Sequence, residues 1–336
     1  MRVGTVSFVS SSLQLRVVLK PQSSSSCSDP GSLEVHVTGC RIAWAGGNST
    51  LPGHLGVRTK FSGSLRPSST MAEAPYWLRE ICDRLRESPS KLISLNLNLR
   101  RFSVEWMRVF ADALRENNSV VDLNLTSSIR GDPEALTYLA DRAICQHGSV
   151  VNLMLQYNEL RDVSALSRAL ETNMSVRRLD LGHNKLTSND VGCLVPVLVE
   201  NRLEELSLHY NDISDEGCIA MASVLAKNTS LRCLRLNGNP LSESGLGALR
   251  TLLSSNCTLC HLALSSETKA LGLVSEINLL VRANKAGRSM LSLSPPLALW
   301  PRVLARCGSD VDVLFFFLQS KPELVRTSKK RKLARD

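Results

Sequence analysis

Residues Leu231 to Leu241 read LRCLRLNGNPL, and the spacing of their leucines decides the fold. Leu231, Leu234, Leu236 and Leu241 stand three, two and five residues apart, with Asn239 between the last two. A strand with one buried face shows period two, and a helix face shows steps of three and four, so no single element accounts for this spacing. The stretch therefore predicts a strand that runs into a turn.

The same spacing recurs along the chain. VVNLMLQYNEL begins at Val150, VRRLDLGHNKL at Val176 and LEELSLHYNDI at Leu203. With the first stretch, these copies carry one asparagine each at the same place: Asn158, Asn184, Asn211 and Asn239. Shorter copies begin at Leu92, Val120 and Leu259, and successive starts lie 26 to 30 residues apart. A fixed period of this length predicts an array of seven stacked repeats.

The pattern L-x-x-L-x-L-x-x-N-x-L resembles the ribonuclease-inhibitor class of leucine-rich repeats, over roughly Leu92 to Ser266. The resemblance implies an α/β horseshoe solenoid in which each repeat is a strand, a turn and a helix. Parallel strands would line the concave face, helices would cover the convex face, and helical caps would close the ends. The four asparagines would form a structural ladder by hydrogen-bonding turn backbone groups that burial leaves without a partner.

Net charge is +9 and the sequence pI is about 9.2, which by itself would favour a nucleic-acid or acidic-membrane partner. The surplus lies in residues 1–70 and in 329–336, which leaves 28 basic and 28 acidic residues between Met71 and Ser328. The array lacks the clustered Lys and Arg of a phosphate-binding surface. We therefore expect it to bind neither nucleic acid nor a membrane.

The flanking segments differ from the repeats in composition. Residues 1–70 carry PQSSSSCSDPGS and no repeat, which predicts an extension that is disordered or serves targeting; alternatively, the working chain starts at Met71. Residues 71–91 predict an N-terminal capping helix before the array at 92–266. The basic tail at 327–336, with KKRK from Lys329, predicts either a solvated end or a nuclear import signal.

Residues 267–326 predict a C-terminal helical cap. Trp300, Val303, Leu304, Leu314 and Phe317 would pack on the last repeat. The alternative is an adaptor helix pair, loosely like an F-box, that recruits degradation machinery. Pro301 inside the first of these helices argues against that alternative.

No set of residues predicts catalysis, a metal site or a cofactor. The ten cysteines are spread through apolar positions of a long chain, which favours reduced core thiols. Cys257 and Cys260 form one CxxC, and His261 alone does not complete a zinc site. Cys233 beside His261 is the nearest approach to a nucleophile with a base, and two ladder neighbours are the simpler interpretation.

Side chains between the leucines would project from the strands onto the concave face, where equivalent positions of successive repeats are neighbours. There they form a surface of mixed charge with aromatic residues at its rim, which is typical of protein binding because Tyr and Arg are frequent among the residues that dominate interface energies. The candidate protein-binding residues are Tyr157, Arg178, Asp180, Glu205, His209, Tyr210 and Arg235.

These observations predict a monomeric, non-catalytic scaffold that binds a protein, with a cytoplasmic location or, if the basic tail is an import signal, a nuclear one. One alternative is a GTPase activator that engages a small GTPase, because the Ran GTPase-activating protein uses this repeat class. That family usually carries an acidic stretch after its repeats, whereas this chain ends in KKRKLARD. A substrate adaptor for ubiquitin ligation is the second alternative.

Overall fold

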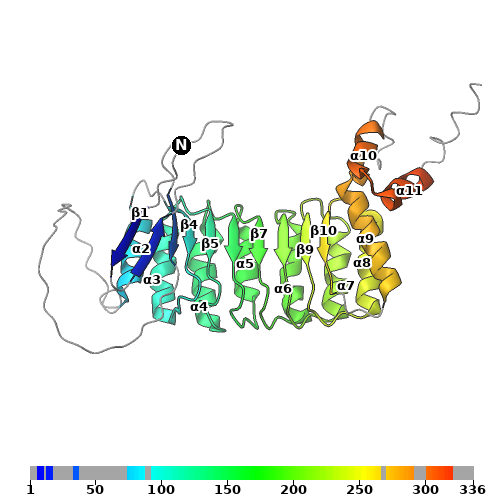
Figure 1. The fold of residues 1–336 in the computed structure, drawn as a ribbon. Coiled ribbons are helices and arrows are strands. Elements are labelled where there is room, and N and C mark those ends of the chain that lie inside the picture. The colour runs from blue at the N-terminus through cyan, green and yellow to red at the C-terminus, as the bar shows by residue number, and fades with distance from the viewer. Residues whose placement is uncertain are drawn as a thin grey trace, which may run out of the picture.

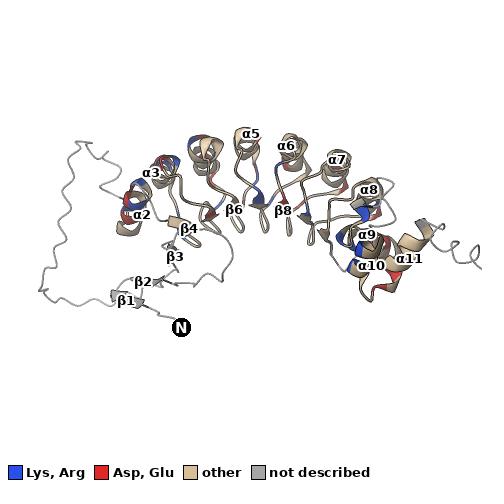
Figure 2. Ribbon diagram, turned by 90° about the horizontal axis from the view of Figure 1, so that it is seen from above, with Lys and Arg blue, Asp and Glu red and all other residues tan. Residues whose placement is uncertain are grey.

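The computed structural model describes residues 74–87, 92–265, 270–290 and 300–320, and the backbone of three short strands nearer the N-terminus. The described chain forms an arc, with the strands on the inner face and the helices on the outer face (Figures 1 and 2). The α/β horseshoe implied by the resemblance to leucine-rich repeats is thereby confirmed. Among the described residues, none of the helices is both long and apolar enough to span a bilayer.

Each repeat contributes one strand and one helical segment. The strands of the array are β4 (Leu92–Asn96), β5 (Asp122–Asn124), β6 (Asn152–Met154), β7 (Arg178–Asp180), β8 (Glu205–Ser207), β9 (Cys233–Arg235) and β10 (His261–Ala263). The helix α2 (Tyr76–Arg86) precedes the first of these strands. The helices of the repeats are α3 (Val104–Arg115), α4 (Pro133–Tyr138), α5 (Ser164–Thr172), α6 (Ser188–Val199), α7 (Asp215–Leu225), α8 (Glu243–Ser255) and α9 (Leu271–Lys285). In the second repeat, α4 continues as a π-helix, η1 (Leu139–Ala143), and a 3₁₀ turn, η2 (Ile144–Gln146).

The strands β4 to β10 pair in parallel and in chain order, always in the same register. Leu206, for example, pairs with Leu179 on one side and Leu234 on the other. Strands alternate their side chains, so the leucines of all repeats point to one core and the residues between them point to the concave face.

The uneven leucine spacing follows from this path of the chain. Leu234 lies in β9 and Leu236 follows it directly. Their side chains point into the core and are 0% and 1% exposed. Leu241 returns to the same core after the turn and is partly buried there. Burying such a side chain stabilises the fold by about 1.5–3 kcal/mol. The buried leucines of all the repeats belong to one continuous hydrophobic cluster, so every repeat adds to this stabilisation.

Asn158, Asn184, Asn211 and Asn239 hold the turns that follow the strands. Each is less than 10% exposed. The side-chain amide of Asn211 donates to the carbonyl oxygens of Leu181 and Leu208 at 3.0 Å each, and its Oδ1 accepts from the backbone N–H of Leu186 at 3.1 Å. Each asparagine thereby ties its own turn to the turn of the preceding repeat.

A second asparagine ladder lies at the other end of the repeats, where helices return to strands. Asn228 accepts from the backbone N–H groups of Ser230 and Leu231 at 3.0 and 2.8 Å, and donates to the carbonyl oxygen of Leu198 at 2.8 Å. Asn117, Asn173 and Asn256 make the same kind of contacts. The N-x-[ST] sequences at Asn173, Asn228 and Asn256 are therefore turn signals whose asparagines are buried.

Three strands precede the array: β1 (Val6–Ser10), β2 (Leu13–Val17) and β3 (Leu33–Val37). β1 and β2 pair antiparallel, β3 joins β2, and β3 pairs in parallel with β4. The prediction of a disordered or targeting extension at 1–70 misses these strands; the rest of that segment lies outside the described residues. The physical reason is the unpaired edge that β4 presents, onto which short alternating sequences such as VSFVS and LEVHV can add.

At the C-terminal end, α9 leads to η3 (Arg288–Met290), α10 (Trp300–Cys307) and α11 (Val311–Ser320). Trp300, Val303 and Phe317 are buried in a second cluster with Ala283 of α9 and with Ala286, the residue that follows this helix, and Leu304 packs against it. These residues therefore pack on α9, the helix that follows the last strand of the array, β10.

Pro301 lies in the first turn of α10, where proline is tolerated, so it does not argue against an adaptor role. The basic tail at 327–336 lies outside the described residues.

Candidate protein-binding surface

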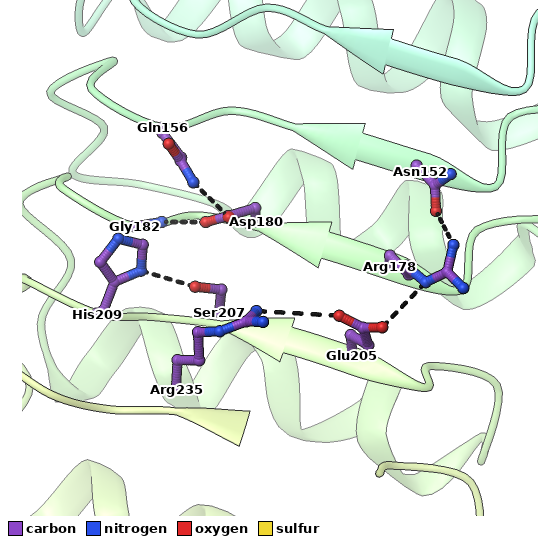
Figure 3. A network of polar contacts seen from close by, with 9 residues as sticks. All are labelled: Asn152, Gln156, Arg178, Asp180, Gly182, Glu205, Ser207, His209 and Arg235. Atoms are coloured by element: carbon purple, nitrogen blue, oxygen red, sulfur yellow. Dashed lines mark hydrogen bonds and ion pairs between the residues drawn. The ribbon is translucent and has the colours of Figure 1, made fainter. Parts of the chain in front are cut away.

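The concave face carries a connected set of polar and charged side chains from five neighbouring strands, β5 to β9, and Figure 3 shows the part on β6 to β9. Glu205 on β8 is bridged by Arg178 of β7, with Nε to Oε1 at 3.1 Å, and by Arg235 of β9, with Nη1 to Oε2 at 3.9 Å. Arg178 also donates from Nη1 to Oδ1 of Asn152 on β6 at 3.0 Å, and Asn152 bonds Asp122. We call these five residues the concave network. They are neighbours because their repeats share one register.

A second set of polar side chains lies at the C-terminal ends of the strands. Oδ1 of Asp180 accepts from the backbone N–H of Gly182 at 3.0 Å, and its Oδ2 accepts from the side-chain amide of Gln156. Oγ of Ser207 lies 2.7 Å from Nδ1 of His209. These bonds fix the direction of each side chain, so the polar surface is preorganised.

Beyond the strand ends, three rings from successive repeats form a stack. Tyr157 and His183 lie parallel with centroids 4.1 Å apart, and His183 and Tyr210 lie 4.4 Å apart. The edge of His209 meets the His183 ring at 4.9 Å. We call Tyr157, His183 and Tyr210 the aromatic column. Tyr157 and Tyr210 remain 49% and 53% exposed, so the column is presented to solvent.

The backbone around the column is arranged to hold these rings. Tyr157, His183 and Tyr210 all have positive φ, between 50° and 54°, a conformation that side chains of this size rarely adopt. A Cβ on Gly182 would stand 2.0 Å from the His209 ring, and a Cβ on Gly238 would stand 2.5 Å from the Tyr210 ring. The two glycines thus leave the space that the rings occupy.

Burial lowers the pKa of His209, and the nearby His183 and Arg235 act in the same direction against the opposing charge of Asp180. The imidazole of His209 is therefore neutral at pH 7. A neutral ring packs against Tyr210 without the cost of burying a charge.

The structure places all seven predicted binding residues on or beside the concave face. It joins Arg178, Glu205 and Arg235 into one network, and brings Tyr210 and Tyr157 together through His183. Asp180 stands apart from the network and instead orients Gln156. The predicted set omitted His183, Asn152 and Gln156. The recurrence of aromatic residues just before Asn158, Asn184 and Asn211 was the signal that could have found His183.

The cysteines offer no activated thiol on this face. Burial raises the pKa of Cys233, which pairs in register with His261. Burial also raises the pKa of Cys260 beside the single CxxC. In the part of the chain that the structure describes, no group of three or more His, Cys, Asp or Glu side chains is placed to hold a metal ion.

The repeats also match a known protein family in sequence. A family model described as Leucine Rich repeat matches residues 172–195, 201–222 and 227–249, which cover the turns at Asn184, Asn211 and Asn239. The chain is a leucine-rich repeat protein.

Its relatives include larger proteins with such repeats. Over 162 residues this leucine-rich repeat protein is 29% identical to "NACHT, LRR and PYD domains-containing protein 4C" of Mus musculus, a match that covers 47% of this chain and 16% of that protein. The human "NACHT, LRR and PYD domains-containing protein 13" is 29% identical over 162 residues, covering 47% of this chain and 15% of that protein. The matched region is thus a small part of each relative.

Two solved structures show looser likenesses. "Leiomodin-1 Actin-Binding Site 2 (ABS2)" has a TM-score of 0.35 at 16% identity, over 66% of this chain and 96% of that one. An internalin (inlF) from Listeria monocytogenes has a TM-score of 0.36 at 20% identity, over 57% of this chain and 60% of that one. Scores this low support no conclusion about function.

Proposed function

We propose that this leucine-rich repeat protein is a non-catalytic interaction module that binds a protein partner through its concave face. The observation that carries the proposal is the half-exposed aromatic column beside the concave network. Tyr and Arg are the residue types that dominate interface energies most often, and here both kinds are held in place by neighbouring repeats.

The energetics of the face favour binding through the rings. The ion pairs of Glu205 with Arg178 and Arg235 are exposed to solvent, and such pairs contribute little to the fold, about 0–1 kcal/mol. The backbone of Tyr157, His183 and Tyr210 carries a conformational cost of about 1–3 kcal/mol for each residue. The same left-handed backbone recurs at Leu99, Ser127 and Gly238, so it belongs to the turn of each repeat. That turn presents the rings of Tyr157 and Tyr210 half-exposed, where a partner can cover them.

The comparisons support the coarser part of the proposal. The relatives are named for leucine-rich repeats that occur beside other domains, and this chain aligns with only 16% of protein 4C. A role as an interaction module is consistent with that arrangement. The ribonuclease-inhibitor-like class stays a prediction, supported by repeats of 26 to 30 residues that each contain a helical segment.

A pair of variants tests the proposal. Proteins near the chain would be labelled in its native cell by a fused labelling enzyme and quantified for the parent, for Arg178→Ala/Tyr210→Ala and for Met174→Ala. Met174 is 66% exposed and lies outside the concave network and the aromatic column, which makes it a matched control. We expect a set of proteins that the double variant loses and the control keeps. Identical sets for all three chains would contradict the proposal.

The GTPase-activator alternative is distinguished by an activity assay. Arg178 and Arg235, the arginines of the concave network, are both engaged by Glu205, so reaching a nucleotide would require breaking an ion pair. We expect no faster phosphate release when the chain is added to a GTP-loaded Ran-type protein. Accelerated release would replace the scaffold proposal with the activator.

A further inference from the structure

The aromatic column ends at a step that lacks a ring. The position that holds Tyr157, His183 and Tyr210 is occupied by Ser127 in the second repeat and by Leu99 in the first. All five residues share positive φ, with Ser127 at 54° and Leu99 at 62°. The backbone N–H of Leu99 donates to the carbonyl oxygen of Thr126 at 2.9 Å, and that of Ser127 donates to the carbonyl oxygen of Gln156 at 2.9 Å. The backbone hydrogen bonds between neighbouring repeats therefore continue through this position.

We propose that Leu99, Ser127 and Tyr157 form a slot that takes an aromatic side chain of the protein partner. This inference rests on the proposed function, since it names what the partner places on the concave rim. The bound ring would lie over Ser127 and continue the column by one step.

The spacing between neighbouring repeats leaves room for one ring between Leu99 and Tyr157. Strands of a sheet lie about 4.8 Å apart, so Leu99 and Tyr157, which are two steps apart, are separated by about twice that distance. Rings within the column already stack at 4.1 and 4.4 Å. A ring inserted over Ser127 would therefore meet Tyr157 at stacking distance on one side and Leu99 on the other.

The walls of the slot favour an apolar ring over the other planar group of proteins, the guanidinium of arginine. Leu99 is 60% exposed and offers only apolar contact. Glu159, two residues beyond Tyr157, already pairs with Lys185, with Oε2 to Nζ at 2.6 Å, so its carboxylate is not free to receive a guanidinium.

The slot can be tested on the full chain without knowing the partner. The chain has four tyrosines, so 3-fluorotyrosine labelling gives one ¹⁹F NMR signal for each, assigned by Tyr→Phe variants. The probe is N-acetyl-tryptophanamide, and N-acetyl-leucinamide and N-acetyl-argininamide are its controls. We expect a saturable shift of the Tyr157 signal with the tryptophan probe, half-complete in the millimolar range expected for one side chain. The signals of Tyr76 on α2 and Tyr138 on α4 serve as internal references and should stay in place.

A variant that fills the slot completes the test. Ser127→Phe adds a ring but no tyrosine, in a backbone conformation that Tyr157 and Tyr210 already accept. Its Tyr157 signal should be displaced from the start and respond to no probe, while unchanged Tyr76 and Tyr138 signals show that it folds.

Either of two results would overturn the slot: a Tyr157 response to the arginine or leucine probe as large as that to the tryptophan probe, or an undiminished response in Ser127→Phe. Absence of any Tyr157 shift would also overturn it. Failure of the proposed function appears separately, as concave-face variants that lose no cellular partner, and leaves this titration unaffected.

Discussion

Replacing Asn211 by alanine removes one rung of the ladder that holds the turns. The substitution deletes the hydrogen bonds to the backbone N–H of Leu186 and to the carbonyl oxygens of Leu181 and Leu208, and a longer one to the carbonyl oxygen of His209 at 3.3 Å. Leu181, Leu186 and Leu208 are all 0% exposed, so water does not replace the lost partners. A buried backbone group without a partner costs about 1–3 kcal/mol.

The magnitude depends on which groups keep another partner. The carbonyl oxygen of Leu181 also accepts from Asn184 at 2.9 Å, and that of Leu208 also accepts from Asn239 at 2.9 Å. The N–H of Leu186 loses its bond to Oδ1 and contributes the full penalty, while the two carbonyls lose one of two bonds each. We therefore expect a loss of about 2–4 kcal/mol in the free energy of unfolding.

Urea unfolding followed by circular dichroism measures this loss. The matched control is Asn237→Ala, an asparagine of the next repeat that is only half-buried on the concave face, for which we expect a change within about 0.5 kcal/mol. A destabilisation by Asn211→Ala no larger than that of the control would refute the assignment of the ladder as a main support of the turns.

Further predictions concern glycine, histidine and the N-terminal strands. Gly182→Ala should destabilise the fold by about 1–3 kcal/mol, because the new Cβ displaces the His209 ring. Gly192→Ala in α6 should stabilise the fold by about 0.5–1 kcal/mol, because no atom lies within 4 Å of the new Cβ. Thermal unfolding of both variants measures the two changes. Burial lowers the pKa of His147 below its ordinary value of about 6.5, so the native state resists protonation and stability should fall as the pH drops through that value. His147→Asn, which matches Asn117 in the helix-to-strand ladder, should weaken this pH dependence, and an unchanged pH profile would exclude His147 as its source. A chain that starts at Met71 lacks β1 to β3 and should melt at a lower temperature, because β4 loses β3, one of its two partner strands; an equal Tm would show that residues 1–70 are dispensable for stability.

The elements that could be read from the sequence are those set by contacts within one repeat or between equivalent positions. Leu234 and Leu236 two residues apart require a strand, and Asn239 requires a turn, so the order of elements follows from local pattern. The placement of Arg178 beside Glu205 follows from the fixed period, because parallel strands in one register bring equivalent residues together.

Other features depend on geometry that the pattern does not encode. The aromatic column needs left-handed backbone at Tyr157, His183 and Tyr210, and vacant space at Gly182 and Gly238. Neither the left-handed backbone nor the vacant space is visible in the leucine spacing.

Long-range packing was also missed. The added strands β1 to β3 and the separate cluster of α10 and α11 involve contacts between segments that share no repeat with the array. Local pattern gives no register for such pairings.

Site-specific photocrosslinking in the native cell tests the central claim, that a protein covers the concave face. A photoreactive phenylalanine would replace Tyr210 in the aromatic column in one chain and Met174, which is 66% exposed outside the column, in another. The account predicts a discrete crosslinked product of higher mass from position 210 that is absent from position 174. Equal crosslinking at both positions, or product at 174 alone, would contradict it.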